Sequence, residues 1–414
     1  MSNKLRILFI HQNFPGQFKL LVGALAAKNQ HEIVCLGDAA NIRIQQSPPG
    51  MSVFGYRARE PRKSDTHHYL LSTQNAVRRG QDVVRACQSL TAKGFYPDLI
   101  VGHPGWGDML FLPDVFPNTK IVSLFEFFYQ SSGADVGFDP EFNAGPDTAF
   151  KLRMRNTTQL HALQETDLGI SPTHWQKSTY PSRYQPQIEV IHEGIETRLL
   201  KPNANATFEL PDGKILDHST PVVTYISRQL EPYRGFHQFM RALPGLQQAL
   251  PDAQFVIVGG DGVSYGGAPP KPHKTYRQWM LGEVGNQLDN QRTHFVGKIP
   301  YPDYLRLLQV SRLHIYLTYP FVLSWSVLEA MACGVPLLAS NTAPVREVIE
   351  DGVNGYLFDF FDRQALTDKA HDVLMVEQSN ISQSARQTII DRYDFQTVSL
   401  PAYERAIQSL GLTL

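Results

Sequence analysis

The feature that most constrains the fold of this chain is an alternation of short apolar runs with stretches long enough for a helix. In the first half the runs are Ile7–Ile10, Ile33–Leu36, Leu99–Val101, Ile121–Leu124, Leu168–Ile170 and Ile188–Ile191. The second half repeats the rhythm at Val222–Ile226, Phe255–Val258, His294–Val296, Leu313–Leu317, Pro336–Ala339 and Tyr356–Phe358. Buried strands separated by helices are typical of parallel sheets. The pattern therefore predicts an α/β fold of two doubly wound parallel-sheet domains in tandem.

The length of 414 residues suits two domains, each able to bury its own core. We expect the boundary near Glu196, because 196–220 lacks periodicity and contains the loop-like stretch KPNANATFELPDGK. This gives an N-terminal domain over 1–195 and a C-terminal domain over 196–394. From 395 to 414, apolar residues have helical spacing at Val398, Tyr403, Ile407 and Leu410. The spacing predicts a C-terminal helix, which we expect to pack back on the N-terminal domain.

The composition excludes some function classes. Hydrophobic residues make up 42% and charged residues 19% of the chain, and the formal net charge is -1, so we expect no nucleic-acid partner. The run at Ile7–Ile10 is too short for a signal peptide or a membrane span, so a cytoplasmic location is the expectation. Cys35, Cys87 and Cys333 lie far apart without metal-ligand spacing, which predicts neither a disulfide framework nor a zinc site.

Loops after strands are the first places to search, because open parallel sheets bind ligands beyond the carboxyl ends of their strands. Pro15 and Gly16 make a turn before a helix expected at about Gln17, where free N–H groups suit a diphosphate; taken alone, an ordinary turn explains this loop better. His103 follows the strand LIV beside two glycines, as a ligand contact or as a satisfied structural histidine. Glu126 follows IVSLF, where it would orient an acceptor hydroxyl or cap a helix.

In the second half, the run VVTYIS leads directly into RQLEPYRGF. This places Arg228 and Arg234 on either side of a turn that carries Pro232 and Gly235. Guanidinium groups donate in a fixed fork that suits phosphate oxygens, so we predict that the pair faces one pyrophosphate. Ordinary surface arginines are the alternative interpretation.

The stretch YPFVLSWSVLEAMACGVPLLAS combines a loop with a short helix. Ser324 and Ser326 stand near the expected helix start, where N–H groups and the positive end of the dipole would face a diphosphate. Glu329 lies one turn further on and can accept both hydroxyl protons of a ribose. A buried amphipathic helix with one stray glutamate is the alternative, but an unpaired carboxylate in an apolar segment is costly, which favours a ligand role.

These features together resemble the retaining glycosyltransferases of family 4, also called glycosyl transferases group 1, which have the fold known as GT-B. The resemblance covers nearly the whole chain and rests on an ordered series of motifs. They are the Pro15–Gly16 turn, His103, VIHEGIE at Val190–Glu196, ISRQLEPYRG at Ile226–Gly235, VIVGGDG at Val256–Gly262, SVLEAMACGVPLLAS at Ser326–Ser340 and the following VREVIEDGVNGYLF. The resemblance implies two Rossmann-like domains facing a cleft, the first for the acceptor and the second for a nucleotide-sugar donor.

Carried onto this sequence, the resemblance makes Arg228 and Arg234 the diphosphate-binding pair and Glu329 the ribose-binding carboxylate. Gly16 would close over the phosphates, and His103 would lie beside the donor sugar. The implied reaction transfers a sugar from a UDP- or GDP-linked donor to a glycan, lipid-linked or other hydroxyl acceptor, by a front-face mechanism that retains the anomeric configuration. No metal and no cofactor are implied, which fits arginines in place of a cation at the leaving diphosphate. We take His103 and Glu126 as the candidate catalytic residues.

The sequence also departs from the family pattern. Family members commonly carry a glutamate that contacts donor-sugar hydroxyls eight positions before the ribose-binding one, and here that position is Phe321. The usual lysine is replaced by Arg234, which preserves the charge. The phenyl ring removes an acceptor and places an apolar group near the sugar. Our hypothesis is a deoxy sugar or a different sugar orientation, with Trp325 or main-chain groups supplying contacts.

A basic stretch forms a further hypothesis. From Arg57 to Lys93 there are eight basic and three acidic residues. Such a surplus would face an anionic acceptor or a membrane surface, placing the protein peripherally at the inner face of the membrane, although a solvated helix face explains it as well.

Three other function classes stay open, because the fold alone does not settle the reaction. One is a catalytically degenerate subunit that binds a nucleotide sugar, for which Phe321 is the best argument. The others are a nucleotide-sugar epimerase and a pyridoxal-phosphate phosphorylase, which would need a lysine that carries the cofactor. The retained Arg228, Arg234, Glu329 and His103 favour a transferase.

Overall fold

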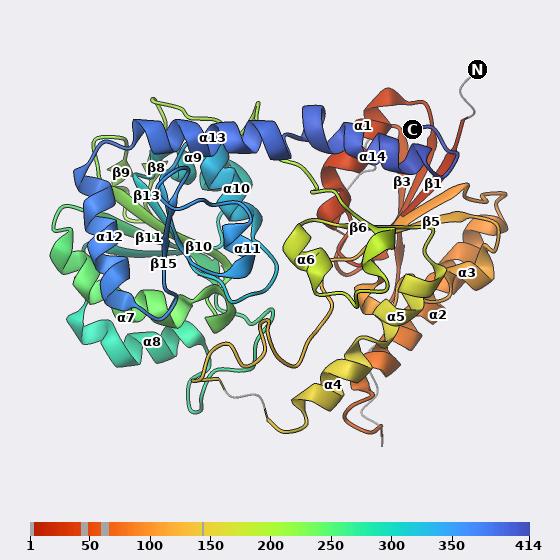
Figure 1. Ribbon diagram of the computed structural model, residues 1–414, viewed down its shortest axis with the longest axis horizontal. Coiled ribbons are helices and arrows are strands. Elements are labelled where there is room, and N and C mark those ends of the chain that lie inside the picture. The colour runs from red at the N-terminus through yellow and green to blue at the C-terminus, as the bar shows by residue number, and fades with distance from the viewer. Residues whose placement is uncertain (1–3, 43–48, 59–65, 143–144) are drawn as a thin grey trace. The chain divides into compact units, whose positions relative to one another are not determined.

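The computed structural model describes residues 4–42, 49–58, 66–142 and 145–414 (Figure 1). The chain divides into two compact units, one formed by Met1–Gly194 with Phe395–Leu414 and the other by Ile195–Asp394. The boundaries expected from the sequence lie next to these positions.

The first unit is built on a seven-stranded parallel sheet with the order β3-β2-β1-β4-β5-β6-β7. Its strands are β1 (Arg6–Ile10), β2 (Glu32–Asp38), β3 (Met51–Tyr56), β4 (Leu99–Gly102), β5 (Lys120–Leu124), β6 (Leu168–Ser171) and β7 (Ile188–Val190). All of the predicted apolar runs are strands. The sequence missed β3, because this edge strand is mostly exposed or half-buried and shows no continuous apolar run.

Helices cover both faces of this sheet. They are α1 (Lys19–Lys28), α2 (Leu71–Thr91), α3 (Leu112–Val115), α4 (Thr148–Arg155), α5 (Thr157–Glu165), α6 (His174–Ser178) and α14 (Leu400–Gln408), with short turns of other helix types at η1 (Gly16–Phe18), η2 (Pro104–Trp106), η3 (Gln185–Gln187) and η6 (Phe395–Ser399). Alternate residues of β1 point to opposite faces: Ile7 and Phe9 pack with α1 and α14, whereas Leu8 and Ile10 pack with α2 and α3. Helices α1 and α14 lie side by side (Figure 1), joined by the ion pair of Lys28 with Glu404.

The second unit is built on a six-stranded parallel sheet with the order β12-β11-β10-β13-β14-β15. Its strands are β10 (Val222–Gln229), β11 (Gln254–Gly260), β12 (Thr293–Gly297), β13 (Leu313–Tyr316), β14 (Leu337–Ser340) and β15 (Tyr356–Phe358). The stretch 196–220, which looks like a loop in sequence, belongs to this unit and forms an antiparallel hairpin of β8 (Phe208–Glu209) and β9 (Ile215–Leu216). The buried side chains of Phe208 and Leu216 join the core of this unit. The hairpin was not predicted, because a two-residue strand is too short to show a hydrophobic pattern in the sequence.

The helices of the second unit complete its layers. They are α7 (Phe236–Ala249), α8 (Tyr276–Val284), α9 (Tyr301–Val310), α10 (Trp325–Ala332), α11 (Ala343–Arg346), α12 (Arg363–Met375) and α13 (Ser379–Tyr393), with short turns at η4 (Pro232–Arg234) and η5 (Gly285–Gln287). The apolar residues of α9, α10 and α13 share one core with the strands. Arg386 of α13 donates to backbone carbonyls, including that of Leu200, which fastens the segment before β8 to this unit.

The strand order positions the candidate sites. In both sheets the chain order reverses beside the first strand, because β1 lies between β2 and β4, and β10 lies between β11 and β13. An open α/β sheet binds ligands at this reversal, beyond the carboxyl ends of the strands. The loops after β1 and β4, and after β10 and β13, are therefore the places to examine.

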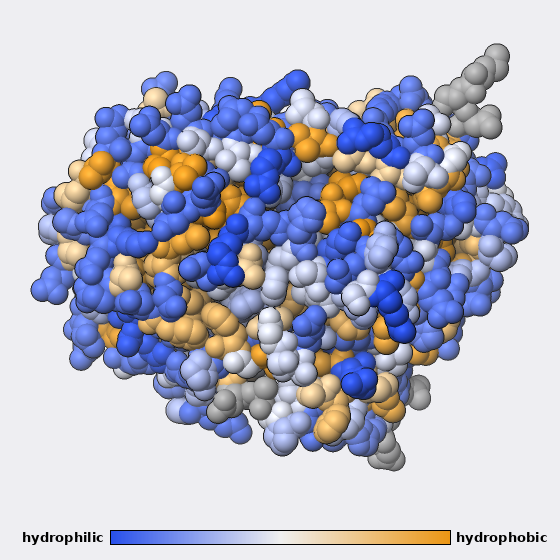
Figure 2. Space-filling model, in the orientation of Figure 1, coloured by the Kyte–Doolittle hydropathy of each residue, from blue (hydrophilic) through white to orange (hydrophobic). Residues whose placement is uncertain are grey.

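The polarity of the surface and the length of the helices bear on contact with membranes. On the face shown in Figure 2, polar side chains dominate both units and apolar ones form smaller patches. Within the described ranges of the chain, no helix is long and apolar enough to cross a membrane.

The C-terminal helix offers a test of the first unit's core. Ile407 of α14 is 1% exposed within it, so Ile407→Ala should lower the unfolding free energy by about 2–5 kcal/mol through lost burial and a cavity. The control is Gln408→Ala at the exposed neighbouring position, which should change stability little. Denaturant unfolding measures both, and equal stabilities would contradict the packing of α14.

Candidate functional site

In the first unit, four polar side chains meet beyond the ends of β1, β4 and β5. His11 follows β1, His103 follows β4 and Glu126 follows β5, while Gln17 lies on the turn η1. His103 Nε2 lies 3.3 Å from Glu126 Oε2, and Gln17 Nε2 donates to Glu126 Oε1 at 2.9 Å. His11 Nε2 lies 2.8 Å from Gln17 Oε1. The structure thus brings together His103 and Glu126, as neighbouring strands of a parallel sheet allow.

The backbone contacts of the two histidines show which ring nitrogen of each one donates a hydrogen bond. His103 Nδ1 accepts from the N–H of Gly105 at 3.1 Å, so its proton is on Nε2, which donates to Glu126. His11 Nδ1 likewise accepts from the N–H of Asn13 at 3.0 Å, and its Nε2 donates to Gln17. Both oxygens of Glu126 therefore accept hydrogen bonds from side-chain N–H groups, one of His103 and one of Gln17.

Gly16 and Trp106 pack around the two histidines. Gly16 has a φ of 50°, and a Cβ at this position would lie 2.4 Å from His11 Cε1, so no side chain fits there. The Trp106 ring stacks on His103 with 4.1 Å between ring centroids. This packing holds His11 and His103 in place while their polar edges point into the network.

Burial sets the charges of the network. Burial and the neighbouring His103 lower the pKa of His11 to about 3, outweighing the opposite effect of Glu126, so His11 is neutral near pH 7. Burial by itself would raise the pKa of Glu126, but the hydrogen bond and charge of His103, with smaller effects of His11 and Gln17, lower it. The cluster therefore carries the Glu126 carboxylate in its ionised form and a neutral His11 near pH 7.

In the second unit, the two predicted arginines are not equivalent. Strand β10 has a bulge between Ile226 and Gln229, where its pairing with β11 gains one residue. Arg228 lies in this bulge and is exposed, whereas Arg234 on the turn η4 is 7% exposed. Of the two, only Arg228 is open to solvent, and the prediction that the pair faces one pyrophosphate stays a prediction.

Arg234 is surrounded by neutral acceptors. Its Nη1 lies within 2.8–2.9 Å of the Tyr316 hydroxyl at the end of β13, the Thr318 hydroxyl and the Val322 carbonyl. Burial alone would lower the pKa of Arg234, but Tyr316, Tyr265 and the negative charge of the buried Glu231 together raise it above its ordinary value. Among the described residues, no ion pair is found for Arg234. The reversal between β10 and β13 thus holds a buried cation without a salt bridge.

Helix α10 presents the other predicted groups. Ser324 is its N-cap, and its hydroxyl oxygen accepts from the N–H of Ser326 at 3.4 Å and lies 3.0 Å from the Ser326 hydroxyl. Glu329 is half-buried and accepts from the hydroxyls of Tyr301 at 3.0 Å and Tyr304 at 2.5 Å. Burial and the Glu329 charge raise the pKa values of both tyrosines, so both remain donors. The carboxylate thus already binds two hydroxyl groups.

Phe321 and Trp325 differ in exposure. Phe321 is 5% exposed, and its ring packs against Tyr233 and Tyr265 with centroid separations of 5.4 and 5.0 Å. The Phe321 ring is therefore covered by other aromatic side chains, and its position near the donor sugar stays a prediction. Trp325, the first residue of α10, is 41% exposed and open to a ligand.

Sequence reasoning missed several residues of these clusters. His11 and Gln17 stand in HQNFPGQF, directly after the first strand, and the placement rule that found His103 would have found them. Tyr301 and Tyr304 gave no such signal, because their contact with Glu329 spans 25 or more residues and depends on how α9 packs.

The basic stretch is partly paired. Arg79 donates to the Tyr56 hydroxyl at 3.0 Å, and Arg85 lies 2.6 Å from Asp82. Residues 59–65, which hold three of the basic side chains, lie outside the described residues. A membrane contact of this stretch stays a prediction.

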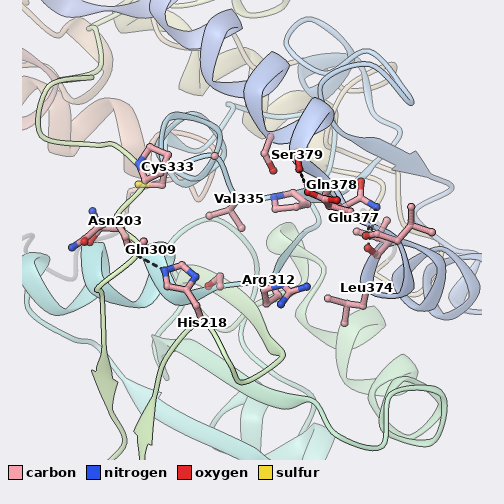
Figure 3. A pocket seen from close by; sticks show the side chains of 18 residues that line it. Asn203, His218, Gln309, Arg312, Cys333, Val335, Leu374, Glu377, Gln378 and Ser379 are labelled. Carbon is pink, nitrogen blue, oxygen red and sulfur yellow. Dashed lines mark hydrogen bonds between the residues drawn. The ribbon is translucent and has the colours of Figure 1, made fainter.

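A separate cavity of about 370 Å³ lies in the second unit (Figure 3). It is lined in part by Arg312, which precedes β13, and by Val335, which precedes β14, so it opens at the opposite ends of these strands from Arg234. His218 on its wall bonds the carbonyl of Asn203 at 2.9 Å. None of the residues predicted as a site lines this cavity.

Two family models match this chain. One, described as "Glycosyl transferase family 4 group", matches residues 29–200, and the other, "Glycosyl transferases group 1", matches residues 209–388. This chain belongs to the group 1, family 4-like glycosyltransferases. The first match lies mostly in the first structural unit of this glycosyltransferase, and the second match lies in the second unit.

Curated relatives share part of its length. A "GDP-mannose-dependent alpha-(1-6)-phosphatidylinositol monomannoside mannosyltransferase" of Mycolicibacterium smegmatis is 26% identical over 216 residues, which is 51% of this chain and 53% of that protein. "Spore coat protein SA" of Bacillus subtilis is 26% identical over 250 residues, 55% of this chain and 61% of that protein. The match thus spans a little over half the length of each of these relatives.

Solved structures agree on the fold. Sucrose-phosphate synthase from Thermosynechococcus elongatus has a TM-score of 0.73 at 18% identity and covers 99% of this chain and 100% of its own. The Anabaena protein HepE, in complex with UDP and glucose, has a TM-score of 0.66 at 20% identity and covers 98% of this chain and 100% of its own. With the two parallel sheets, these likenesses confirm the predicted GT-B fold.

The low pKa of His11 has a measurable consequence. Because His11 resists protonation in the folded state down to about pH 3 but not when unfolded, it should cost stability as the pH falls below about 6.5. The loss is roughly 1.4 kcal/mol for each pH unit in that window. From pH 7 to pH 5 the unfolding free energy of the wild type should therefore fall more steeply than that of His11→Gln, which lacks the buried imidazole. Denaturant unfolding at pH 7, 6 and 5 measures both. An exposed control, His161→Gln, should run parallel to the wild type; a parallel His11→Gln curve would contradict the assignment.

Proposed function

We propose that this protein is a retaining, metal-independent glycosyltransferase that moves a hexosyl or deoxyhexosyl group from a nucleoside diphosphate sugar to a hydroxyl of a glycan or lipid-linked acceptor. The observation that carries the proposal is the buried guanidinium of Arg234, which donates hydrogen bonds to neutral groups at the strand reversal of the second sheet.

The hydrogen-bond partners of this buried cation are neutral, and the nearby Glu231 carboxylate acts on its charge without forming an ion pair with it; such a cation favours an anionic ligand. Taking a guanidinium out of water costs several kcal/mol, and hydroxyl and carbonyl acceptors compensate only part of this. A diphosphate would supply the missing charge and match the fork geometry of the guanidinium. Arg228, exposed at the bulge of β10, is free to add a second contact. The cationic side chains thus support stabilisation of the leaving diphosphate without a metal.

The contacts of Glu329 support a ribose site. Two tyrosine hydroxyls donate to its two oxygens, which is the arrangement that the 2′- and 3′-hydroxyls of a ribose would need. Ser324 and Ser326 at the start of the same helix add hydroxyl groups and N–H donors near the positive end of its dipole. One similar protein is a GDP-mannose-dependent mannosyltransferase, and HepE is in complex with UDP, so we infer a UDP- or GDP-linked donor.

The network of the first unit supports a role in the chemical step. Glu126 is a carboxylate whose pKa is lowered, so it is ionised near pH 7 and orients the Nε2–H of His103. A fixed negative charge of this kind stabilises the positive charge that develops on a sugar ring as the bond to the diphosphate breaks. In a front-face reaction the departing phosphate oxygen takes the proton of the acceptor hydroxyl while the new bond forms on the same face.

A nucleotide-sugar-binding subunit without turnover is the second candidate, because Phe321 is buried among aromatic rings where the family commonly has a carboxylate. Product analysis with one labelled donor decides between the classes. A labelled glycoside supports transfer, an altered sugar nucleotide indicates an epimerase, and bound but unchanged donor indicates the subunit.

Arg234→Ala should weaken the binding of UDP or GDP, whichever binds the wild type, on the order of ten- to a hundredfold, since a charge-assisted hydrogen bond contributes about 1.5–3 kcal/mol. Isothermal titration calorimetry measures the change. Glu329→Gln should abolish the preference for the ribonucleotide over its 2′-deoxy analogue. Arg363→Ala, at an exposed position of α12, is the matched control and should bind as the wild type does. Unchanged affinity in Arg234→Ala would contradict the diphosphate site.

His103→Asn and Glu126→Gln should each slow sugar release from the donor on the order of a hundredfold. Nucleotide affinity should stay within about twofold, because neither residue belongs to the unit that holds Arg234 and Glu329. Glu165→Gln, at an exposed position of the first unit, is the control. A full rate in both variants would remove the two residues from the chemical step.

A further inference from the structure

A fully buried carboxylate shapes the loop after β11. Glu231 is 0% exposed, and its carboxylate accepts from the backbone N–H groups of Ser264, Tyr265 and Gly266 at 3.1–3.2 Å. A buried carboxylate is costly unless it is hydrogen-bonded, and three N–H donors satisfy it here. The conformation of the loop and the burial of Glu231 therefore depend on each other.

Two further side chains fasten the same loop. At its start, the N–H of Gly262 donates to Gln229 Oε1 at 3.1 Å. At its end, the Tyr276 hydroxyl donates to the carbonyl of Gly267 at 3.0 Å. The segment between them is held at three points, so the position of its one aromatic residue, Tyr265, is fixed.

Tyr265 lies over the groups that the donor site needs. Its ring centroid is 5.4 Å from the guanidinium carbon of Arg234 and 5.0 Å from the ring of Phe321. Arg234 and Phe321 are buried, whereas Tyr265 is half-exposed. Tyr265 is therefore the outer layer over the buried cation and presents a ring and a hydroxyl to whatever binds there.

We propose that Tyr265, positioned by Glu231, contacts the sugar of the nucleotide sugar and thereby selects among donors. This rests on the proposed function. The group next to a diphosphate bound by Arg234 is the sugar, whose apolar face packs on an aromatic ring and whose hydroxyls exchange hydrogen bonds with a phenol. Phe321 is covered and offers neither contact. Tyr265 is a specificity-determining residue, and Glu231 is a positioning residue that acts through it.

The experiment compares Tyr265→Phe, Tyr265→Ala and Glu231→Gln with the wild type. Calorimetry gives the affinities for UDP, GDP and a panel of their conjugates, namely UDP-glucose, UDP-galactose, UDP-N-acetylglucosamine and GDP-mannose. In the Tyr265 variants the affinity ratio between the preferred conjugate and the next should change at least about tenfold. The affinity for the bare nucleotide should stay within about twofold. Glu231→Gln, which weakens the three loop bonds, should shift the same ratio in the same direction.

Tyr356→Phe is the matched control, because it removes a tyrosine hydroxyl of the same unit that bonds Gln378 instead. Unchanged donor ratios in both Tyr265 variants overturn the proposal, as does an equal loss for the bare nucleotide and every conjugate. Neither result depends on Glu231→Gln folding well. A different result would contradict the proposed function itself: the Arg234→Ala variant would then bind the nucleotide as tightly as the wild type does.

Discussion

The buried guanidinium of Arg234 is the interaction on which the candidate site of the second unit depends. Strand β13 supplies the Tyr316 hydroxyl, the following loop supplies Thr318 and the Val322 carbonyl, and the Tyr225 hydroxyl of β10 donates to the carbonyl of Arg234 itself at 2.6 Å. The two central strands and the loops that leave them are thereby tied to one cation. Because these partners are neutral, they orient the charge without cancelling it.

The first unit shows the converse arrangement. There the charged group is the carboxylate of Glu126, and its partners are the N–H groups of His103 and Gln17. Burial keeps His11 neutral near pH 7, so the His11 ring does not compensate the carboxylate. Each unit thus holds a charged side chain at the strand reversal of its sheet, Glu126 in the first and Arg234 in the second, and polar side chains hydrogen-bond it. Such preorganised charges act on a ligand without first breaking an ion pair.

The sequence predicted most of the strands and the loops that carry the sites, because hydrophobic periodicity and the position of a residue after a strand are local properties. It placed Glu329 on a helix and Ser324 at the start of that helix, as the structure shows. The sequence did not predict the bulge in β10, because one extra residue in a strand does not change the hydrophobic pattern. The exposure of Arg228, which lies in this bulge, and the burial of Arg234 were therefore not foreseen either. Sequence reasoning also could not find Glu231, because only tertiary folding shows that its three donors come from a loop more than 30 residues away.

The charges around Arg234 explain why a phenylalanine can stand at position 321. The neighbouring Val322 carbonyl bonds Arg234, so residue 321 lies beside the cation. The Phe321 side chain is a phenyl ring buried against Tyr233 and Tyr265, so it adds no negative charge beside the guanidinium. The buried carboxylate in this region is Glu231, which acts on the charge of Arg234 and binds the N–H groups of the loop after β11. That loop brings Tyr265 over the same cation, so one carboxylate both adjusts the charge of Arg234 and positions the aromatic ring that covers it.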